Sequence, residues 1–279
     1  MTRPCRSALY IPAANARAME KARDLPADAI IFDLEDAVAP AEKEAARALL
    51  EAALKADYGR RLKILRINAL ETEWGQGDAA LATRLPVDAV LLPKVGGPAD
   101  LDALAGLVEA PFWAMIETPA GVLNAAAIAA HPRLEGMVMG TNDLAKELGA
   151  RFRPDRLPMI AALGACLLAA RAEGRVILDG VYNAFRDEEG LRAEAEQGRD
   201  MGFDGKTLIH PSQLSVANAV FAPTEAELDL ARRQIAAFEA AEAEGRGVAV
   251  LDGRIVENLH VAAARRSLAR AKAIEEAGF

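Results

Sequence analysis

The chain has 279 residues, of which 52% are hydrophobic and 27% are charged, proportions that are ordinary for a folded globular protein. Its formal net charge of −8 argues against a nucleic-acid partner, because binding to phosphates requires a basic surface. The apolar runs are far shorter than the roughly 20 residues of a membrane-spanning helix, and MTRPCRSALYIP lacks signal-peptide organisation. Cys5 and Cys166 suggest no disulfide framework. We therefore expect a cytoplasmic protein that is not bound to a membrane.

Eight short apolar runs that end in polar or charged residues recur along the chain, separated by alanine-rich stretches with helical spacing. The runs begin, in chain order, at Ser7, Ala29, Leu62, Ala89, Phe112, Gly136, Arg175 and Gly205. Helices are expected over residues 14–23, 41–55, 98–108, 120–130, 158–173 and 187–201. A strand followed by a helix, eight times over, is typical of a closed (β/α)8 TIM barrel, which is an α/β fold. We assign residues 1–220 to this catalytic barrel.

Residues 221–279 go beyond what a barrel needs and predict a C-terminal helical extension. Thr224 is the expected N-cap of a long helix, because an acidic first turn follows it and helical spacing continues to Glu244. The segment GRGVAVLDGRIVENLH then predicts a glycine-punctuated ribbon, and residues 261–276 predict a final basic amphipathic helix. The extension either covers its own barrel or packs as a lid on a neighbouring subunit.

Polar and charged residues stand where the expected strands end, and TIM barrels carry their active sites at the carboxyl ends of the strands. These residues are Glu35, Asp36, Arg66, Lys94, Glu117, Asp143, Asp179 and His210. The clustering predicts an enzyme, with Arg66, Glu35 and Asp36 among the catalytic candidates.

Glu117 and Asp143 end the fifth and sixth expected strands, and neighbouring strands lie about 4.8 Å apart. Two carboxylates at this separation can bind one cation, and room for water and substrate oxygens suits Mg²⁺. The pattern does not distinguish Mn²⁺ from Mg²⁺. The three histidines are scattered, which argues against a zinc cluster. In the alternative interpretation, each carboxylate caps a helix or pairs with a barrel lysine.

Arg66 closes the third apolar run and is a candidate clamp for a substrate carboxylate or carbonyl, because a guanidinium binds such groups bidentately. A salt bridge to Glu35 or Asp36 is the alternative, and both hold if these acids orient the arginine. Lys94 permits a Schiff-base interpretation, although a structural or electrostatic cation is the competing and favoured one. His210 either hydrogen-bonds a substrate or caps a helix.

Seven motifs occur in order between Arg6 and Leu214: RSALYIP, IIFDLEDAV, RIN, LPKV, IET, GTNDL and GFDGKTLIHPSQL. In these motifs the chain resembles the citrate lyase β-subunit-like branch of the HpcH/HpaI aldolase superfamily. The resemblance covers essentially the whole expected barrel. It implies that the protein cleaves or forms carbon–carbon bonds in 3-hydroxyacyl-CoA compounds such as malyl-CoA, or hydrolyses their thioesters.

The resemblance also implies roles for particular residues. Glu117 and Asp143 match the family's Mg²⁺ ligands, and Arg66 matches a residue that contacts the acid or keto end of the substrate. Further positions that contact substrate or CoA in the family correspond to Tyr10, Lys21, Asn142, Asp143, Ile209 and His210. One CoA-contacting arginine of the family is Asn15 here, and Arg17 is the candidate substitute.

The tail departs from the lyases of this family. They carry an aspartate in a G-x-x-(I/V)-D segment that reaches an adjacent subunit of a trimer or hexamer, whereas this chain has GRIVENLHV with Glu257 at the matching position. The segments VENLHV, GVYNAFRDEEG and TEWG look most like those of the family's (3S)-malyl-CoA thioesterases. This similarity implies Mg²⁺-dependent hydrolysis of (3S)-malyl-CoA to (S)-malate and CoA by a homotrimer or hexamer. Glu257 is one methylene longer than aspartate, and our hypothesis is that the longer side chain favours the activation of water. The alternative is that Glu257 takes the role of the aspartate unchanged.

Two alternatives stay open at this point. The first is a reversible lyase for malyl-CoA, β-methylmalyl-CoA or citramalyl-CoA, which yields glyoxylate or pyruvate and an acyl-CoA. The second is a non-catalytic or partner-dependent subunit like citrate lyase β. The intact set Arg66, Glu117 and Asp143 speaks against the second.

Overall fold

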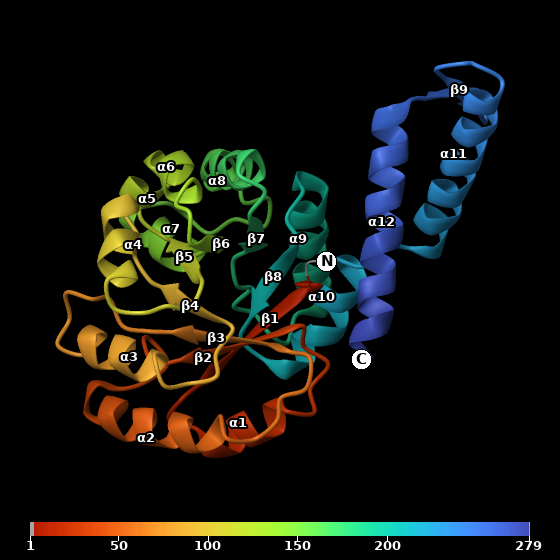
Figure 1. The fold of residues 1–279 in the computed structure, drawn as a ribbon. Coiled ribbons are helices and arrows are strands. Elements are labelled where there is room, and N and C mark those ends of the chain that lie inside the picture. Colours follow the sequence, from red (N-terminus) through yellow and green to blue (C-terminus); the bar gives the residue numbers. More distant parts are fainter. Residues whose placement is uncertain (1–2, 279) are drawn as a thin grey trace. The chain divides into compact units, whose positions relative to one another are not determined.

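The computed structural model describes residues 3–278. Within them, eight parallel strands close into a barrel in chain order, and β8 is hydrogen-bonded to β1 (Figure 1). The strands are β1 (Ser7–Pro12), β2 (Ala29–Asp33), β3 (Leu62–Arg66), β4 (Ala89–Leu92), β5 (Phe112–Ile116), β6 (Leu134–Met139), β7 (Val176–Asp179) and β8 (Gly205–Leu208). The predicted (β/α)8 TIM barrel and all eight of its expected strands are confirmed.

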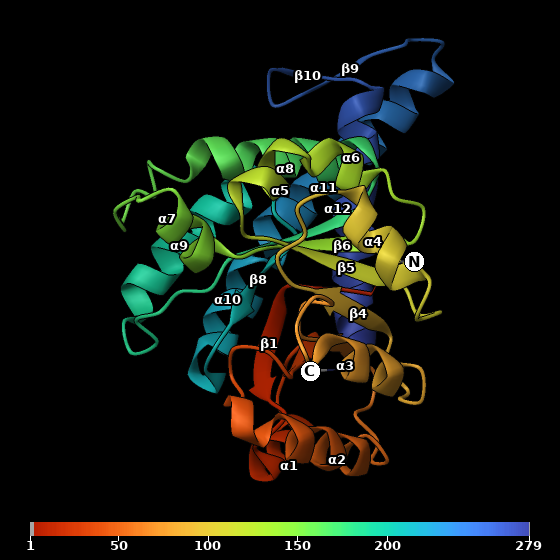
Figure 2. The same ribbon diagram turned by 90° about the vertical axis from the view of Figure 1, so that its left-hand side faces the viewer.

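Helices follow the strands and surround the barrel (Figure 2). They are α1 (Ala16–Ala22), α2 (Lys43–Ala53), α3 (Gly75–Ala82), α4 (Pro98–Ala105), α5 (Pro119–Leu123), α6 (Ala125–Ala129), α7 (Thr141–Glu147), α8 (Ile160–Ala172), α9 (Glu188–Met201) and α10 (Leu214–Val220). The helix expected over residues 120–130 is divided at Asn124, and a 3-10 turn, η1 (Pro40–Glu42), precedes α2. Helices α3, α7 and α10, of 7 or 8 residues each, were not predicted from the sequence.

Alternate strand residues point to opposite sides of the barrel wall. One apolar cluster fills the barrel interior and includes Ala8, Ile31, Ile64, Leu91, Trp113, Met115, Val138 and Leu178. A larger cluster between the wall and the helices contains their strand neighbours, such as Leu9, Phe32 and Leu65. Gly136 leaves room for the indole of Trp113, since a Cβ at this position would lie 2.5 Å from the ring. The alternation therefore decides which strand-end residues face the barrel axis.

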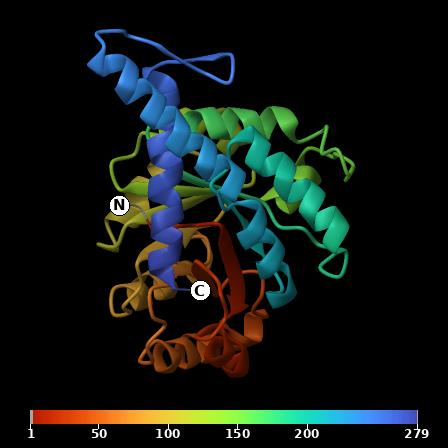
Figure 3. The same cartoon turned by 90° about the vertical axis from the view of Figure 1, so that its right-hand side faces the viewer.

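The residues from Ala222 onward group separately from the barrel residues Cys5–Phe221. They form α11 (Glu225–Ala243), the antiparallel strands β9 (Ala249–Leu251) and β10 (Arg254–Val256), and α12 (Asn258–Ala277). Helices α11 and α12 lie side by side (Figure 3), and Phe238, Val256 and Val261 belong to a small apolar core of their own. The C-terminal helices and the ribbon are thus present as predicted. Across residues 3–278, none of the helices combines the length and apolarity that a membrane span requires.

Candidate active site

A cavity of about 280 Å³ lies at the carboxyl ends of the strands. Its lining includes Tyr10, Asp33, Asp36, Arg66, Glu117, Asn142, Asp143 and Ile209. Strand alternation accounts for this set, because Asp33 and Arg66 stand two residues beyond the inward-facing Ile31 and Ile64. By the same alternation, Glu117 stands two residues beyond Met115. The cavity therefore collects side chains from strands that are far apart in the sequence.

Arg66 is held in a fixed orientation on one side of this cavity. Its Nε donates to Asp33 Oδ1 at 2.7 Å and its Nη2 donates to Asp33 Oδ2 at 2.5 Å. Nη1 lies 2.9 Å from Glu35 Oε2 and 3.8 Å from Asp36 Oδ2. The guanidinium also lies over the ring of Tyr10, 4.9 Å from its centroid. Burial alone disfavours the charge, but Asp33 outweighs it and raises the pKa of Arg66 above its ordinary value.

Asp33 is the main partner of Arg66, and the sequence analysis missed it. Glu35 and Asp36 were the expected partners, and both do lie near the guanidinium. Asp33, however, is the last residue of β2 and pairs in register with Arg66, the last residue of β3. The alternation of side chains along the strand IIFD could have revealed this partner, since it places Asp33 on the same side of the strand as Ile31.

Glu117 is a buried carboxylate in an environment that disfavours its charge. Its side chain is almost inaccessible, and its Oε1 accepts a 2.8 Å hydrogen bond from the backbone N–H of Lys94. Desolvation, followed by the charge of Glu35, raises the pKa of Glu117 to about 8, and Asp143 adds to this rise. Gly140 packs against Glu117 so closely that a Cβ there would lie 2.4 Å from the Glu117 Cβ. Glu117 is therefore confined beside a second acid, Asp143, that lines the same cavity.

Lys94 and Glu35 form an ion pair behind these residues. Lys94 adopts the left-handed conformation with φ of 54°, which directs its N–H to Glu117. Its Nζ lies 3.2 Å from Glu35 Oε1. Burial lowers the pKa of Lys94, but the charge of Glu35 more than offsets this and the net pKa is raised. A Schiff base requires a neutral amine, so this pairing favours the electrostatic interpretation of Lys94.

Several predicted site residues lie outside the cavity lining. Lys21 is exposed on α1, and Asn15 caps that helix by accepting the Ala18 N–H. The Nδ1 of His210 accepts the Ser212 N–H, as in the capping interpretation, and its ring stacks on Phe185 at 4.5 Å. Glu257 belongs to the C-terminal unit, where it precedes α12.

Asp179 also ends a strand but points away from the barrel axis, since Leu178 is the inward-facing residue of β7. Its carboxylate accepts hydrogen bonds from Arg156 Nη1 at 2.7 Å and from Lys206 Nζ at 3.1 Å. Burial raises its pKa, but these two cations lower the pKa below its ordinary value. Asp179 therefore serves the packing of the barrel wall rather than the cavity.

The described residues offer a two-carboxylate site rather than a complete metal cage. In residues 3–278, no three His, Cys, Asp or Glu side chains come together as ligands of one ion. A cation at Glu117 and Asp143 would need water or substrate oxygens to complete its shell, and this is the usual situation of Mg²⁺. The buried Glu35 Oε2 also lacks a hydrogen-bond donor of good geometry. In the described part of the chain, the cavity lining thus holds more acidic side chains, namely Asp33, Asp36, Glu117 and Asp143, than cationic ones, of which Arg66 is the one that the lining contains.

Fold and site together define a TIM-barrel enzyme with an acidic, arginine-containing active-site cavity. The HpcH/HpaI aldolase/citrate lyase family matches residues 6–211, and the chain belongs to this family. The predicted family resemblance is confirmed.

The chain is similar over nearly its whole length to proteins of known activity. It is 67% identical over 273 residues to the (3S)-malyl-CoA thioesterase of Cereibacter sphaeroides (strain KD131 / KCTC 12085), covering 97% of this chain and 96% of that protein. It is 38% identical to the citrate lyase subunit beta of Escherichia coli (strain K12), covering 97% and 94%. Among solved structures, CitE from Mycobacterium tuberculosis in complex with magnesium, acetoacetate and coenzyme A has a TM-score of 0.83 and 35% identity, covering 97% and 98%.

Proposed function

We propose that this protein hydrolyses (3S)-malyl-CoA to (S)-malate and CoA in a Mg²⁺-dependent reaction. The observation that carries the proposal is 67% identity, over nearly the full length of both chains, to a (3S)-malyl-CoA thioesterase. The cavity adds physical support, because it combines a fixed guanidinium with two carboxylates in a space suited to a short acyl group. The protein is therefore an enzyme of the citrate lyase β-like family and not a non-catalytic subunit.

Glu117 and Asp143 are the proposed Mg²⁺ ligands. The fit rests on the donor set, since hard carboxylate oxygens suit Mg²⁺ and Glu117 is buried in the cavity that Asp143 also lines. Crystals of the related CitE contain magnesium. When bound, the ion would act as a Lewis acid on substrate oxygen atoms. Mn²⁺ uses the same ligands and is the second candidate.

The residues of the barrel bind and orient the acyl group in this proposal. Asp33 holds the Arg66 guanidinium through Nε and Nη2, and Glu35 and Met115 contact Nη1, which leaves the second N–H of Nη2 for the malyl carboxylate. Glu35 and Asp36 add negative charge that stabilises the guanidinium. Asn142, at the start of α7, contributes an amide to the same cavity.

Several other residues complete the proposal on the strength of the family resemblance. Tyr10, Lys21, Ile209 and His210 contact the substrate or its CoA moiety. Residues 221–279 act as a lid on the neighbouring subunit of a homotrimer or hexamer, in the cytoplasm. Glu257 from this lid accepts the proton of the water that attacks the thioester carbonyl, after which CoA leaves as the thiol and malate is released.

A carbon–carbon lyase is the second candidate, favoured by 38% identity to citrate lyase subunit beta. One assay separates the two reactions. Incubation with malyl-CoA and Mg²⁺ is expected to release free thiol without glyoxylate, with thiol measured by a chromogenic disulfide and glyoxylate measured as its phenylhydrazone. Stoichiometric glyoxylate without free CoA would instead identify the lyase.

A further inference from the structure

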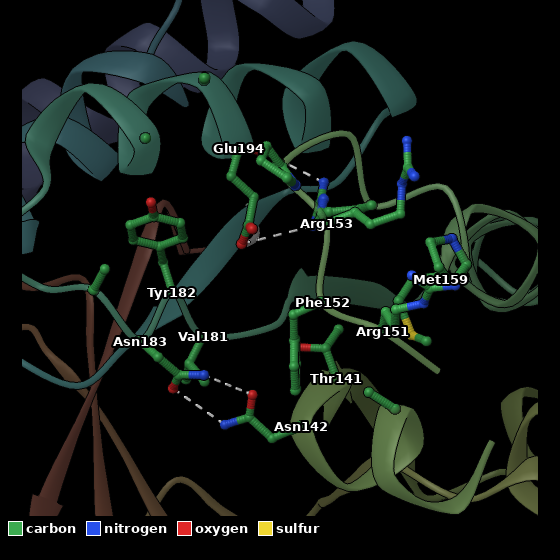
Figure 4. Close-up of a pocket in the computed structure, with 17 residues that line it drawn as sticks. Thr141, Asn142, Arg151, Phe152, Arg153, Met159, Val181, Tyr182, Asn183 and Glu194 are labelled. Atoms are coloured by element: carbon green, nitrogen blue, oxygen red, sulfur yellow. Dashed lines mark hydrogen bonds and ion pairs between the residues drawn. The ribbon is translucent and has the colours of Figure 1, made fainter. Parts of the chain in front are cut away.

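A second cavity, of about 390 Å³, adjoins the active-site cavity (Figure 4). The residues that line both cavities are Thr141, Asn142 and Val181. The remaining walls come from α7, the segment between α7 and α8, the segment after β7, and α9, with Phe152 and Met159 among the apolar residues. Thr141, Asn142 and Val181 therefore form the boundary that the two cavities share.

Asn142 is fixed in this boundary by a reciprocal amide pair. Its Nδ2 donates to Asn183 Oδ1 at 3.2 Å, and Asn183 Nδ2 donates to Asn142 Oδ1 at 2.8 Å. Figure 4 shows the two amides facing each other. Asn183 lines only the second cavity, so it holds Asn142 from the side opposite the active site.

The backbone on both sides of the pair is held in place. Gly180 lies so close to Thr141 that a Cβ there would be 2.3 Å from the Thr141 hydroxyl oxygen. On the other side, Gln213 Nε2 donates to the Tyr182 carbonyl at 2.9 Å. Neither backbone segment has to move for the Asn142 and Asn183 amides to separate.

We propose that the Asn142–Asn183 amide pair is a partition that limits the length of the acyl group, which makes Asn183 a specificity-determining positioning residue. The inference rests on the proposed thioesterase function. In this proposal the short 3-hydroxy diacyl group of malyl-CoA occupies the smaller cavity, and a longer acyl group extends past the Asn142 amide toward the second cavity. Because both amides are exposed to water, the pair discriminates by a moderate factor rather than excluding longer acyl groups completely.

The test compares Asn183→Ala with the wild type and with Phe152→Ala. Phe152 lines only the second cavity and is 72% exposed, so its truncation enlarges that cavity without opening the partition. The measured quantity is kcat/KM for 3-hydroxy diacyl-CoA thioesters longer than malyl-CoA by one or two methylene groups, divided by kcat/KM for malyl-CoA. One methylene in a pocket changes discrimination by about 10-fold or more. We expect this ratio to rise about 10-fold in Asn183→Ala and to stay at the wild-type value in Phe152→Ala.

An unchanged ratio in Asn183→Ala, or an equal rise in both variants, would overturn the partition. Failure of the proposed function is distinguishable, because wild-type protein would then release no thiol from malyl-CoA. In that event, calorimetric titration with the free diacids and Mg²⁺ decides the partition. A gain in affinity for the longer diacid, confined to Asn183→Ala, supports it, and equal affinities in all three proteins reject it.

Discussion

Two groups of charged side chains lie near the strand ends of this barrel, one outside its wall and one inside. The outer group pairs two acids, Asp179 and Glu194, with two cations, Arg156 and Lys206. Lys206 Nζ lies 2.7 Å from Glu194 Oε1, and the cations lower the pKa of Asp179 although burial opposes its charge. Each charge here is balanced, and the group holds α9 and the α7–α8 segment to the wall.

The inner group is not balanced. Asp33, Glu35, Asp36, Glu117 and Asp143 are five acids at or beside the cavity, and the cations that interact with them are Arg66, Lys94 and the buried Lys43. Burial and neighbouring acids therefore raise the pKa of Glu117 to about 8. The contrast shows that burial of charge alone does not mark the active site. In our proposal the active site is marked instead by an excess of acidic side chains that a bound cation would neutralise.

Removing either acid of the proposed metal pair should have the largest effect. Glu117→Gln and Asp143→Asn are each expected to lower kcat/KM for malyl-CoA by about 1,000-fold, because electrostatic stabilisation at the reacting oxygens is lost. Glu147→Gln, on the same helix as Asp143 but exposed, is the matched control and should stay near the wild-type rate. Near-normal turnover in either active-site variant, or in excess EDTA, would contradict the metal assignment.

Breaking the balanced group should affect stability instead of chemistry. Lys206→Met removes a fully buried cation from Asp179 and Glu194, and the free energy of unfolding is expected to fall by about 3–5 kcal/mol. Urea denaturation measures this. Lys272→Met, at an exposed position on α12, should change it by less than about 0.5 kcal/mol. Equal effects of the two substitutions would show that the outer group does not hold α9 and the α7–α8 segment to the barrel wall.

The bidentate contact between Asp33 and Arg66, the Asp33 clamp, is an ion pair that we expect to affect catalysis. Asp33→Asn leaves Arg66 beside Glu35 but removes the bidentate contact, and kcat/KM is expected to fall by about 10- to 100-fold, mainly through loss of orientation. Arg66→Lys, which keeps the charge but loses the fork, should fall at least as far. Steady-state kinetics with malyl-CoA provides the measurement, and an unchanged kcat/KM in Asp33→Asn counts against the clamp.

The raised pKa of Glu117 predicts a pH dependence of stability in protein without bound metal. The folded state holds the Glu117 proton up to about pH 8, whereas the unfolded chain loses it near pH 4.5. Between these values the folded state binds more protons, so its stability falls as pH rises. The wild type should therefore lose stability relative to Glu117→Gln by about 1 kcal/mol or more between pH 5 and pH 8. Parallel curves of unfolding free energy against pH for the two proteins would contradict the raised pKa of Glu117.

The barrel was predictable from the sequence because each strand is an apolar run with a polar end and each long helix fills the gap that follows. Short helices such as α7 and α10 were not, since one or two turns leave no periodic pattern. Asp143 was expected at the end of the sixth strand but lies on α7, four residues beyond the end of β6, and it lines the same cavity as Glu117 because α7 begins close behind β6.

The candidate site was predictable only as far as strand ends locate it. Proximity in sequence favoured Glu35 and Asp36 as partners of Arg66, whereas inter-strand register gives that role to Asp33. Asp179 also ends a strand and was therefore grouped with the site residues. It follows the inward-facing Leu178, however, so its side chain points outside the barrel wall. The Asn142–Asn183 pair joins residues 41 positions apart and left no local signal.

Calorimetric titration with Mg²⁺ tests the central claim most directly. Wild-type protein at pH 7 should bind one ion and release close to one proton, because Glu117 must ionise to coordinate it. Glu117→Gln and Asp143→Asn should each lose this binding, and Glu147→Gln should keep it. Binding of unchanged affinity in both active-site variants would contradict the claim that these two carboxylates share one ion.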